Sequence, residues 1–397
     1  MLMKNSTKSR LNPAPGLGRL SDPLQERAKQ TTARLFNPVL IGGCIIIMAN
    51  LGIRASYGVF RIPVAADFGW PRSDFSLAIA VQNLAWGFGQ PVFGASAERI
   101  GDRRAVVGGA LLYALGLVSS AFATQPVQHQ LLEILVGFGI AGTGFGVILA
   151  VVGRAASTAN RSVALGIVTA AGSAGQVIGA PIAAGLMTIF PWQTVFVIFA
   201  AAILAVLMAL PLMRALARTG RPGPEESLTA VVLRALRALR DPSFTMIFLG
   251  FFSCGYQLAV IAAHFPAFVA ETWGAIDPAG ILAGLGVGST ATLVPVTPTT
   301  VVLFSLAMGA LWLATVPLTS GLVAQIHGIR YRGTLYGIVF FSHQLGSFMA
   351  VWLGGKLYDM YGAYTAVWWI GVGIGAFSAL VHLPIREGRL EISGAAA

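Results

Sequence analysis

Apolar stretches of about 20 residues recur along most of this chain, and each is long enough to cross a bilayer as a helix. Charged residues make up only 10% of the sequence, against about 25% in a soluble domain, so the chain cannot cover a water-facing surface. The sequence therefore predicts an all-α polytopic membrane protein. Ten spans are expected, at residues 38–62, 74–97, 105–123, 131–153, 162–187, 192–213, 243–269, 299–322, 334–358 and 363–384.

An eleventh apolar stretch, 279–295, is short and rich in glycine. We predict that it does not cross the membrane but dips in and returns, or lies flat. Irregular backbone exposed to lipid is costly, so such a segment has to be covered by protein. The alternative is an eleventh crossing, which would reverse the orientation of everything after it.

Basic residues collect on one side of the ten predicted spans. If the spans alternate, 22 of the 26 Lys and Arg residues lie on the side of the N-terminus. The other side has only Arg61, Arg72 and Lys356, and Arg54 falls within a span. An excess of Lys and Arg marks the cytoplasmic face. The sequence thus predicts a multi-pass protein of the inner, or plasma, membrane with both termini in the cytoplasm.

The spans fall into two halves that share a repeat. Arg161 begins Arg-Ser-Val-Ala-Leu-Gly-Ile-Val, and Arg332 begins the similar Arg-Gly-Thr-Leu-Tyr-Gly-Ile-Val 171 positions later. The pairs Asn37-Pro38 and Asp241-Pro242, which open the two halves, are 204 positions apart. The second half is therefore 33 residues short, and the deficit lies between residues 243 and 332.

This repeat predicts five regions. They are a cytoplasmic tail at 1–37, an N-terminal six-helix half at 38–213, a cytoplasmic linker at 214–242, a shortened C-terminal half at 243–384 and a second cytoplasmic tail at 385–397. Within the linker, 227–240 is a basic amphipathic helix that we expect to lie along the anionic inner leaflet. Binding of a partner protein is the alternative for this helix.

Two glycine-rich patterns carry more specific information. The loop after the second span contains six spaced residues, here called the loop motif: Gly94, Glu98, Arg99, Gly101, Arg103 and Arg104. Such charges can pair with helix ends in one conformation and release them in another, although ordinary cytoplasmic charge is the alternative. Span 162–187 carries the second pattern: Gly172, Gly175, Gly179, Pro181 and Gly185.

The loop motif resembles the signature Gly-x-x-x-Asp-Arg-x-Gly-x-Arg-Arg of the major facilitator superfamily, with Glu98 in the Asp position. The glycine-proline span and the two halves are similar to that family as well. Gly69-Trp70-Pro71-Arg72-Ser73-Asp74 resembles the monocarboxylate and oxalate–formate branch. The resemblance implies a two-half helical bundle that acts as a symporter or antiporter. The region around span 8 and mid-span 9, where the branch has a charged residue that engages carboxylates, is the part that this chain lacks.

Arg54 is the strongest candidate for a substrate-binding residue, because an ionisable residue inside a span is costly and usually faces a cavity. We interpret it as a clamp for an anionic substrate, on a helix face shared with Asn50, Tyr57 and Gly58. Snorkelling or pairing with a carbonyl is the alternative. Seven further polar residues are candidates for the same cavity, or else for hydrogen bonds between helices: Gln82, Asn83, Gln176, Tyr256, Gln257, His343 and Gln344.

The expected partners are a small, anionic substrate, the lipid bilayer and a possible coupling proton. His343 is the only titratable candidate expected in mid-span, because Glu133 and His264 are expected at the interface near outer helix ends. The sequence contains no sign of a catalytic residue, a metal site, a cofactor or a nucleic-acid site, and we expect a monomer. Cys44 and Cys254 both fall in apolar stretches and indicate no zinc site.

Three functions stay open at this point. The first is secondary active transport of a small organic anion, resembling a monocarboxylate, by alternating access. The second is a non-transporting, internally deleted derivative of such a transporter, acting as a scaffold or inactive, which the missing 33 residues favour. The third is a membrane-embedded enzyme, for which no nucleophile or metal set is visible.

Overall fold

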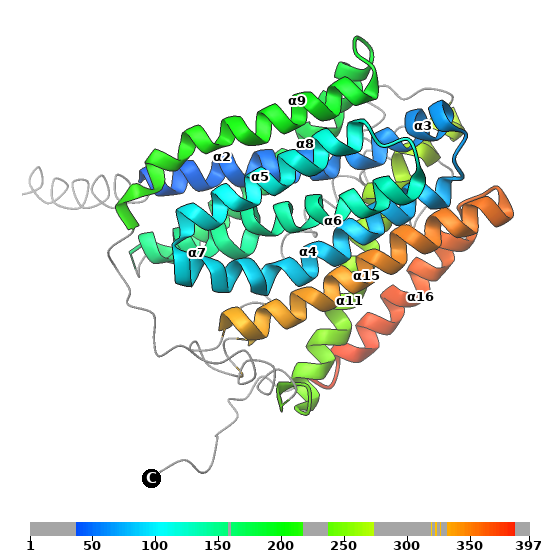
Figure 1. Cartoon of the computed structure of the whole chain (residues 1–397). Helices are drawn as coiled ribbons and strands as arrows, with labels where there is room; N and C mark the ends of the chain where they lie inside the picture. The colour runs from blue at the N-terminus through cyan, green and yellow to red at the C-terminus, as the bar shows by residue number, and fades with distance from the viewer. Residues whose placement is uncertain are drawn as a thin grey trace, which may run out of the picture.

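A computed structural model describes residues 37–157, 160–216, 237–273 and 332–385, with the isolated residues 319, 322, 323 and 326. Every regular element in these ranges is helical (Figure 1). The elements are α2 (Pro38–Ala55), α3 (Tyr57–Phe68), α4 (Arg72–Ile100), α5 (Asp102–Ala121), α6 (Pro126–Thr143), α7 (Phe145–Ala155), α8 (Arg161–Met187), α9 (Trp192–Ala205), η1 (Val206–Leu216), α11 (Pro242–Trp273), α15 (Arg332–Tyr361) and α16 (Thr365–His382). Both predicted tails, the amphipathic helix except its last four residues, 279–295 and nearly all of 299–322 lie outside the described residues.

Eight helical stretches in the described ranges are long and apolar enough to cross a membrane. They are Pro38–Phe68, Asp102–Ala121, Pro126–Ala155, Arg161–Met187, Trp192–Leu212, Pro242–Phe265, Leu335–Tyr361 and Thr365–His382. Each coincides with a predicted span, so the prediction of an all-α polytopic membrane protein is confirmed. The predicted span 74–97 is α4, which at 29 residues measures about 43 Å. It is the most polar of these spans because it carries Gln82, Asn83 and Gln90 inside the bundle.

Two crossings are interrupted by local backbone chemistry. The α2–α3 crossing is interrupted at Ser56, whose hydroxyl donates to the Gly52 carbonyl at 2.8 Å and so competes with the regular helical hydrogen bond to that carbonyl. The α6–α7 crossing breaks at Gly144, which has an extended backbone. The first crossing begins where the Asn37 side chain caps the amide of Leu40 at 2.8 Å, followed by Pro38 in the first turn.

The N-terminal half packs through small residues, as close helix contacts in a membrane require. α2 packs along α8, where a Cβ atom on Gly175 would overlap the carbonyl oxygen of Met48. α6 packs against both α4 and α5, and α5 against α9. In Figure 1, α6 and α15 lie on either side of α4, which places α4 at the centre of the bundle.

Two helix pairs join the N-terminal half to the described C-terminal helices. α4 packs along α15, and α3 packs on α11. At the second contact a Cβ atom on Gly58 would overlap the carbonyl oxygen of Ala262, so the backbones of α3 and α11 touch. α11 in turn packs against α15 and α16. The two halves therefore meet along α3, α4, α11 and α15.

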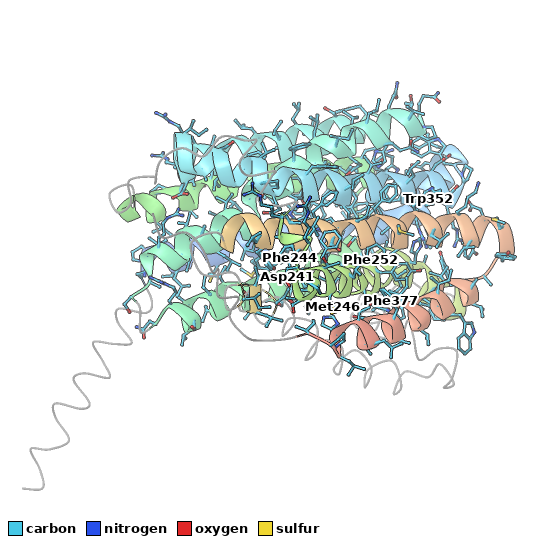
Figure 2. The ribbon with its side chains drawn as sticks, turned by 90° about the horizontal axis from the view of Figure 1, so that it is seen from below. Asp241, Phe244, Met246, Phe252, Trp352 and Phe377 are labelled. Carbon is cyan, nitrogen blue, oxygen red and sulfur yellow. The ribbon has the colours of Figure 1, made fainter. Side chains whose placement is uncertain are left out.

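Large apolar side chains lie on the outside of the bundle, as lipid contact requires. Trp352 of α15 and Phe377 of α16 are 39% and 45% exposed (Figure 2). Leu111 and Leu115 of α5 are also exposed. A soluble protein rarely presents apolar surface of this extent, so the exposed side chains agree with the hydropathy of the spans.

Candidate functional site

Arg54 lies near the end of α2, inside the bundle, with 7% of its surface exposed. Its Nη2 atom donates to Oδ1 of Asn83 on α4 at 2.8 Å. The guanidinium carbon lies 4.7 Å from the centre of the Trp86 ring, a cation–π contact. No carboxylate among the described residues lies within ion-pair distance of Arg54, and its Nε atom has no hydrogen-bond partner. A buried cation thus has only an amide and an aromatic face as partners.

A small cavity lies beside this guanidinium, with room for about one water molecule. Its walls come from both halves of the bundle. The lining residues are Arg54, Tyr57 and Gly58 of α2 and α3, Ile79, Gln82 and Asn83 of α4, Ala259, Ala262 and Ala263 of α11, and Val351 of α15. Opening this cavity wider therefore requires the two halves to move apart.

An aromatic chain leads from Arg54 to His343 on α15. Trp86 makes an edge contact with Phe340 at 5.1 Å, and Phe340 stacks on the His343 ring at 5.6 Å between ring centres. His343 is buried, and its Nδ1 atom has no partner. The next residue, Gln344, packs against Gly87 of α4, and neither polar atom of its side-chain amide is hydrogen-bonded. Both residues lie on the α4–α15 contact close to the cavity.

The remaining predicted residues lie in other places. Gln257 of α11 donates to the carbonyl of Gly371 on α16 at 2.5 Å, which is a hydrogen bond between helices. Its neighbour Tyr256 is buried, with no partner for its hydroxyl. Gln176 is half-buried on α8 and is not among the cavity residues. Asn50 donates to Thr143 and to the Ile140 carbonyl, so it faces α6 rather than the cavity that Tyr57 and Gly58 line.

Arg61, which the charge pattern of the sequence puts among the outer charges, forms a second buried cluster. It is 0% exposed, donates to the hydroxyl of Tyr364 and contacts Nδ1 of His264 on α11. His264 bonds the Val351 carbonyl at 2.8 Å through its other ring nitrogen. Arg61 lies seven residues after Arg54 and hence on the same helix face, a signal that was available in the sequence.

Further contacts close the same end of the bundle. Arg72 lies 4.0 Å over the Tyr358 ring. The backbone amide of Ser73 donates to Asp359 Oδ2 at 3.0 Å. These contacts, with the Arg61 cluster, tie α3 and α4 to α11, α15 and the turn before α16. The cavity is thus closed at the end where α3 finishes and α4 begins.

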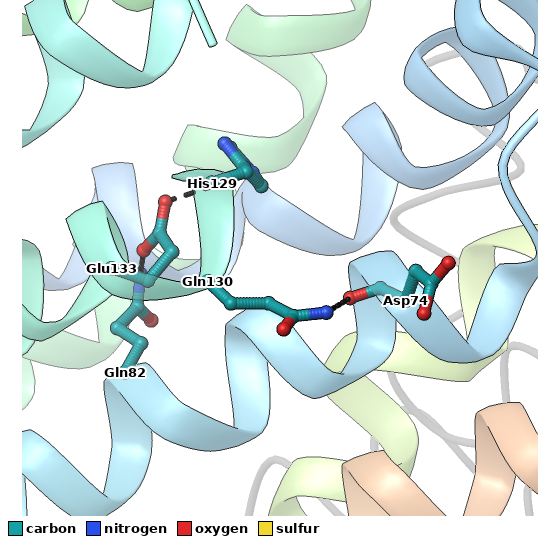
Figure 3. A network of polar contacts seen from close by, with 5 residues as sticks. All are labelled: Asp74, Gln82, His129, Gln130 and Glu133. Atoms are coloured by element: carbon teal, nitrogen blue, oxygen red, sulfur yellow. Dashed lines mark hydrogen bonds and ion pairs between the residues drawn. The ribbon is translucent and has the colours of Figure 1, made fainter. Parts of the chain in front are cut away.

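A third polar group is built around Glu133 on α6 (Figure 3). Gln82 of α4 donates from Nε2 to Oε2 of Glu133 at 2.7 Å. His129, one turn earlier on α6, has its Nε2 atom 3.8 Å from Oε1. Gln130 donates to the backbone carbonyl of Asp74 at 3.3 Å. Glu133 is 0% exposed, and so is His264.

That Glu133 and His264 lie near outer helix ends stays a prediction, but neither side chain is exposed at the surface of the bundle. α6 begins at Pro126, five residues before the predicted span, and this places Glu133 two turns inside the helix. α11 continues to Trp273, four residues beyond the predicted span, so His264 also lies well inside. His343 is consequently not the only buried titratable group within a span.

The loop motif sits at the opposite end of the bundle. Gly101 adopts a φ of 93° between α4 and α5, a conformation that favours glycine. Arg103 and Arg104 are exposed, and the side chains of Glu98 and Arg99 lie outside the described residues. Asp102 accepts from Arg154 Nη2 at 2.6 Å, which ties the start of α5 to the end of α7. The described residues contain no group of three His, Cys, Asp or Glu side chains that could hold a metal.

Two helical halves around a central, partly polar cavity define a membrane transporter for small molecules. The chain belongs to the Major Facilitator Superfamily, whose family model matches residues 42–276. The resemblance stated from the loop motif and the glycine-proline span is thereby confirmed.

Relatives are found among transporters. Over 350 residues the chain is 27% identical to Monocarboxylate transporter 13 of Bos taurus, covering 79% of this chain and 81% of that protein. It is 24% identical over 401 residues to the uncharacterized MFS-type transporter YcxA of Bacillus subtilis (strain 168), covering 89% and 96% respectively. At the level of the family, these relatives are transporters and not enzymes.

Solved structures share the fold. A mutant form of the nucleoside transporter NupG matches with a TM-score of 0.67 at 13% identity, over 87% of this chain and 99% of that one. The D-xylose-proton symporter matches with a TM-score of 0.63 at 14% identity, over 89% and 98%. The arrangement of helices is therefore that of a superfamily transporter.

Proposed function

We propose that this protein carries small organic anions, of the size and charge of a monocarboxylate, across the inner or plasma membrane by alternating access. The single observation that carries the proposal is Arg54, a buried guanidinium on the cavity with no carboxylate partner among the described residues. The likeness to a protein named as a monocarboxylate transporter supports the same class of substrate.

The chemistry of Arg54 favours a carboxylate as its ligand. A cation taken out of water without a counter-ion is unfavourable, and a bound anion relieves that cost. The planar guanidinium can hold a carboxylate through two parallel hydrogen bonds, whereas lysine offers only a point charge. Tyr57, Gln82 and Asn83 line the same cavity and are placed to bind the remaining oxygen atoms of such a ligand.

Alternating access fits the way in which the cavity is closed. The cavity has room for about one water molecule, so a monocarboxylate needs the halves to separate on one side. The Arg61 cluster and the Ser73–Asp359 bond hold the α3 end closed. We infer that these contacts break when the site opens to that side, which the charge distribution assigns to the outside of the cell.

The test is ligand-induced thermal stabilisation of the purified protein by acetate, lactate and pyruvate. A ligand at 100 times its Kd stabilises the folded state by about 2.7 kcal/mol. We expect a shift in the wild type, a smaller shift in Arg54→Lys and none in Arg54→Ala. Arg154→Lys is the matched control, because Arg154 lies at the opposite end of the bundle, and it should behave as the wild type. Equal shifts in all four proteins would rule out Arg54 as the anion clamp.

A further inference from the structure

We propose that Glu133 is the binding site for a proton that crosses the membrane together with the anion. His129 would pass this proton between Glu133 and the solvent at the end of the bundle where α6 starts. The inference rests on the proposed function and adds to it the coupling ion and its residue. It is carried by the geometry of the buried polar group in Figure 3.

The carboxylate of Glu133 is unusually poor in partners for a buried acid. Its one hydrogen bond comes from the Gln82 amide at 2.7 Å, and Oε1 has no hydrogen-bond partner. The hydroxyl groups of Tyr57 and Ser120 lie beside the carboxylate, but neither meets the geometry of a hydrogen bond. No Lys or Arg in the described residues forms an ion pair with Glu133.

The groups that face Glu133 come from four helices. They are His129 on its own helix, Tyr57 on α3, Gln82 on α4, and Tyr113 and Ser120 on α5. None of these carries a fixed positive charge. A charged carboxylate without a cationic partner is costly inside a protein, and such a group takes up a proton instead. Glu133 therefore has a physical reason to bind and release a proton.

His129 supplies a route for that proton. Its Nε2 atom lies 3.8 Å from Glu133 Oε1 and has no hydrogen-bond partner. Its ring stacks on Phe75, with ring centres 5.2 Å apart, which leaves the ring edge facing the acid. A proton passes from the imidazolium Nε2 to the carboxylate Oε1, so one N–H bond breaks, one O–H bond forms, and both groups end neutral. The two atoms lie beyond hydrogen-bond distance, so the transfer requires the two side chains to approach each other.

Gln82 connects this proton site to the anion site. The same side chain lines the cavity beside Arg54 and donates to Glu133. Tyr57 lines the cavity as well and lies beside the acid. Rearrangement of Gln82 when an anion binds Arg54 changes the one hydrogen bond that Glu133 accepts from the described residues. Binding of the anion and binding of the proton are therefore linked, and this link is reciprocal.

The experiment measures transport by the full chain in liposomes, with acetate, lactate and pyruvate as the labelled anions. Electroneutral uptake of one proton with one anion makes an inward gradient of one pH unit concentrate the anion about tenfold. Exchange of labelled for unlabelled anion at equal pH needs no net proton movement. We expect the wild type to show both activities.

Glu133→Gln keeps an acceptor for Gln82 but carries no exchangeable acid. We expect it to continue exchange and to lose the tenfold accumulation, whereas Glu133→Asp should restore the accumulation. A merely structural role for Glu133 would lower exchange and accumulation together. The matched control is Asp67→Asn, a carboxylate on the exposed end of α3 that accepts from Trp192 at 2.6 Å, and it should keep both activities.

The outcomes separate the two claims. No exchange and no uptake of any of the three anions by the wild type would contradict the proposed function. Exchange without a response to the pH gradient, or accumulation that persists in Glu133→Gln, would overturn the proton site alone. If Glu133→Gln does not fold, a pH dye inside wild-type liposomes decides, because the proposal requires proton entry during anion uptake.

Discussion

Arg54 and Arg61 lie on one face of the α2–α3 crossing, about 10 Å apart along the helix axis. Both are buried and neither has a carboxylate partner in the part of the chain that the structure describes. Their neighbours are neutral instead: Asn83 for Arg54, and His264 with Tyr364 for Arg61. The bundle interior therefore holds two guanidinium groups without a counter-ion among the described residues, which agrees with the proposed anionic substrate.

The neutral amide beside Arg54 leads to a prediction for Asn83. In Asn83→Asp a carboxylate would take the position of the amide oxygen that now lies 2.8 Å from Nη2. We expect the ligand-free protein to melt at a higher temperature, and the affinity for lactate or pyruvate to fall at least about tenfold, or 1.4 kcal/mol. Asn83→Ala is the comparison, since it removes the amide without adding charge, and it should lose less affinity for the carboxylate than Asn83→Asp does. Carboxylate binding unchanged in Asn83→Asp would show that Arg54 is not the binding group.

Sequence alone placed Arg54 correctly inside the bundle, but it could not place every polar neighbour. Hydropathy reports roughly how deep a residue lies in a span, and the direction in which it points depends on helix packing. Of the predicted candidates, Gln257 points to Gly371 on α16, while Gln82 lines the cavity. α6 starts five residues before the predicted span, so Glu133 lies two turns inside that helix rather than near its first residue.

Helices follow closely from apolar length, and the eight crossings in the described ranges coincide with predicted spans. The finer breaks do not follow, since Ser56 and Gly144 interrupt crossings whose hydropathy is continuous. The orientation of the C-terminal helices depends on how many times the chain crosses the membrane before them. Most of the shortened region, where the number of crossings is at issue, lies outside the described residues. It therefore stays a prediction that 279–295 does not cross.

The number of crossings is tested by reporter fusions. Because 22 of 26 basic residues fall on one side, fusions at Ala395 and near Arg330 should both report the cytoplasm. A fusion within the turn 122–125 between α5 and α6 serves as the control and should report the outside. An external signal at Ala395 would mean that 279–295 crosses the membrane.

At the scale of the whole molecule, the two halves meet at a cavity, and both halves contribute residues to its walls. α3 and α4 supply Tyr57, Gly58 and Gln82, and α11 supplies Ala262 and Ala263. The contacts that close the α3 end also run between the halves. We propose that one rigid-body movement opens the cavity and breaks these contacts together, as alternating access requires.

The most direct test of the central claim is uptake of labelled pyruvate by liposomes that contain the purified wild-type protein or Arg54→Ala. We predict saturable uptake by the wild type and uptake at the level of empty liposomes by the variant, with Arg154→Lys transporting as the wild type does. Circular dichroism checks that all three proteins are folded. Uptake by Arg54→Ala equal to that of the wild type would contradict the account, and so would a folded wild type that carries none of acetate, lactate and pyruvate.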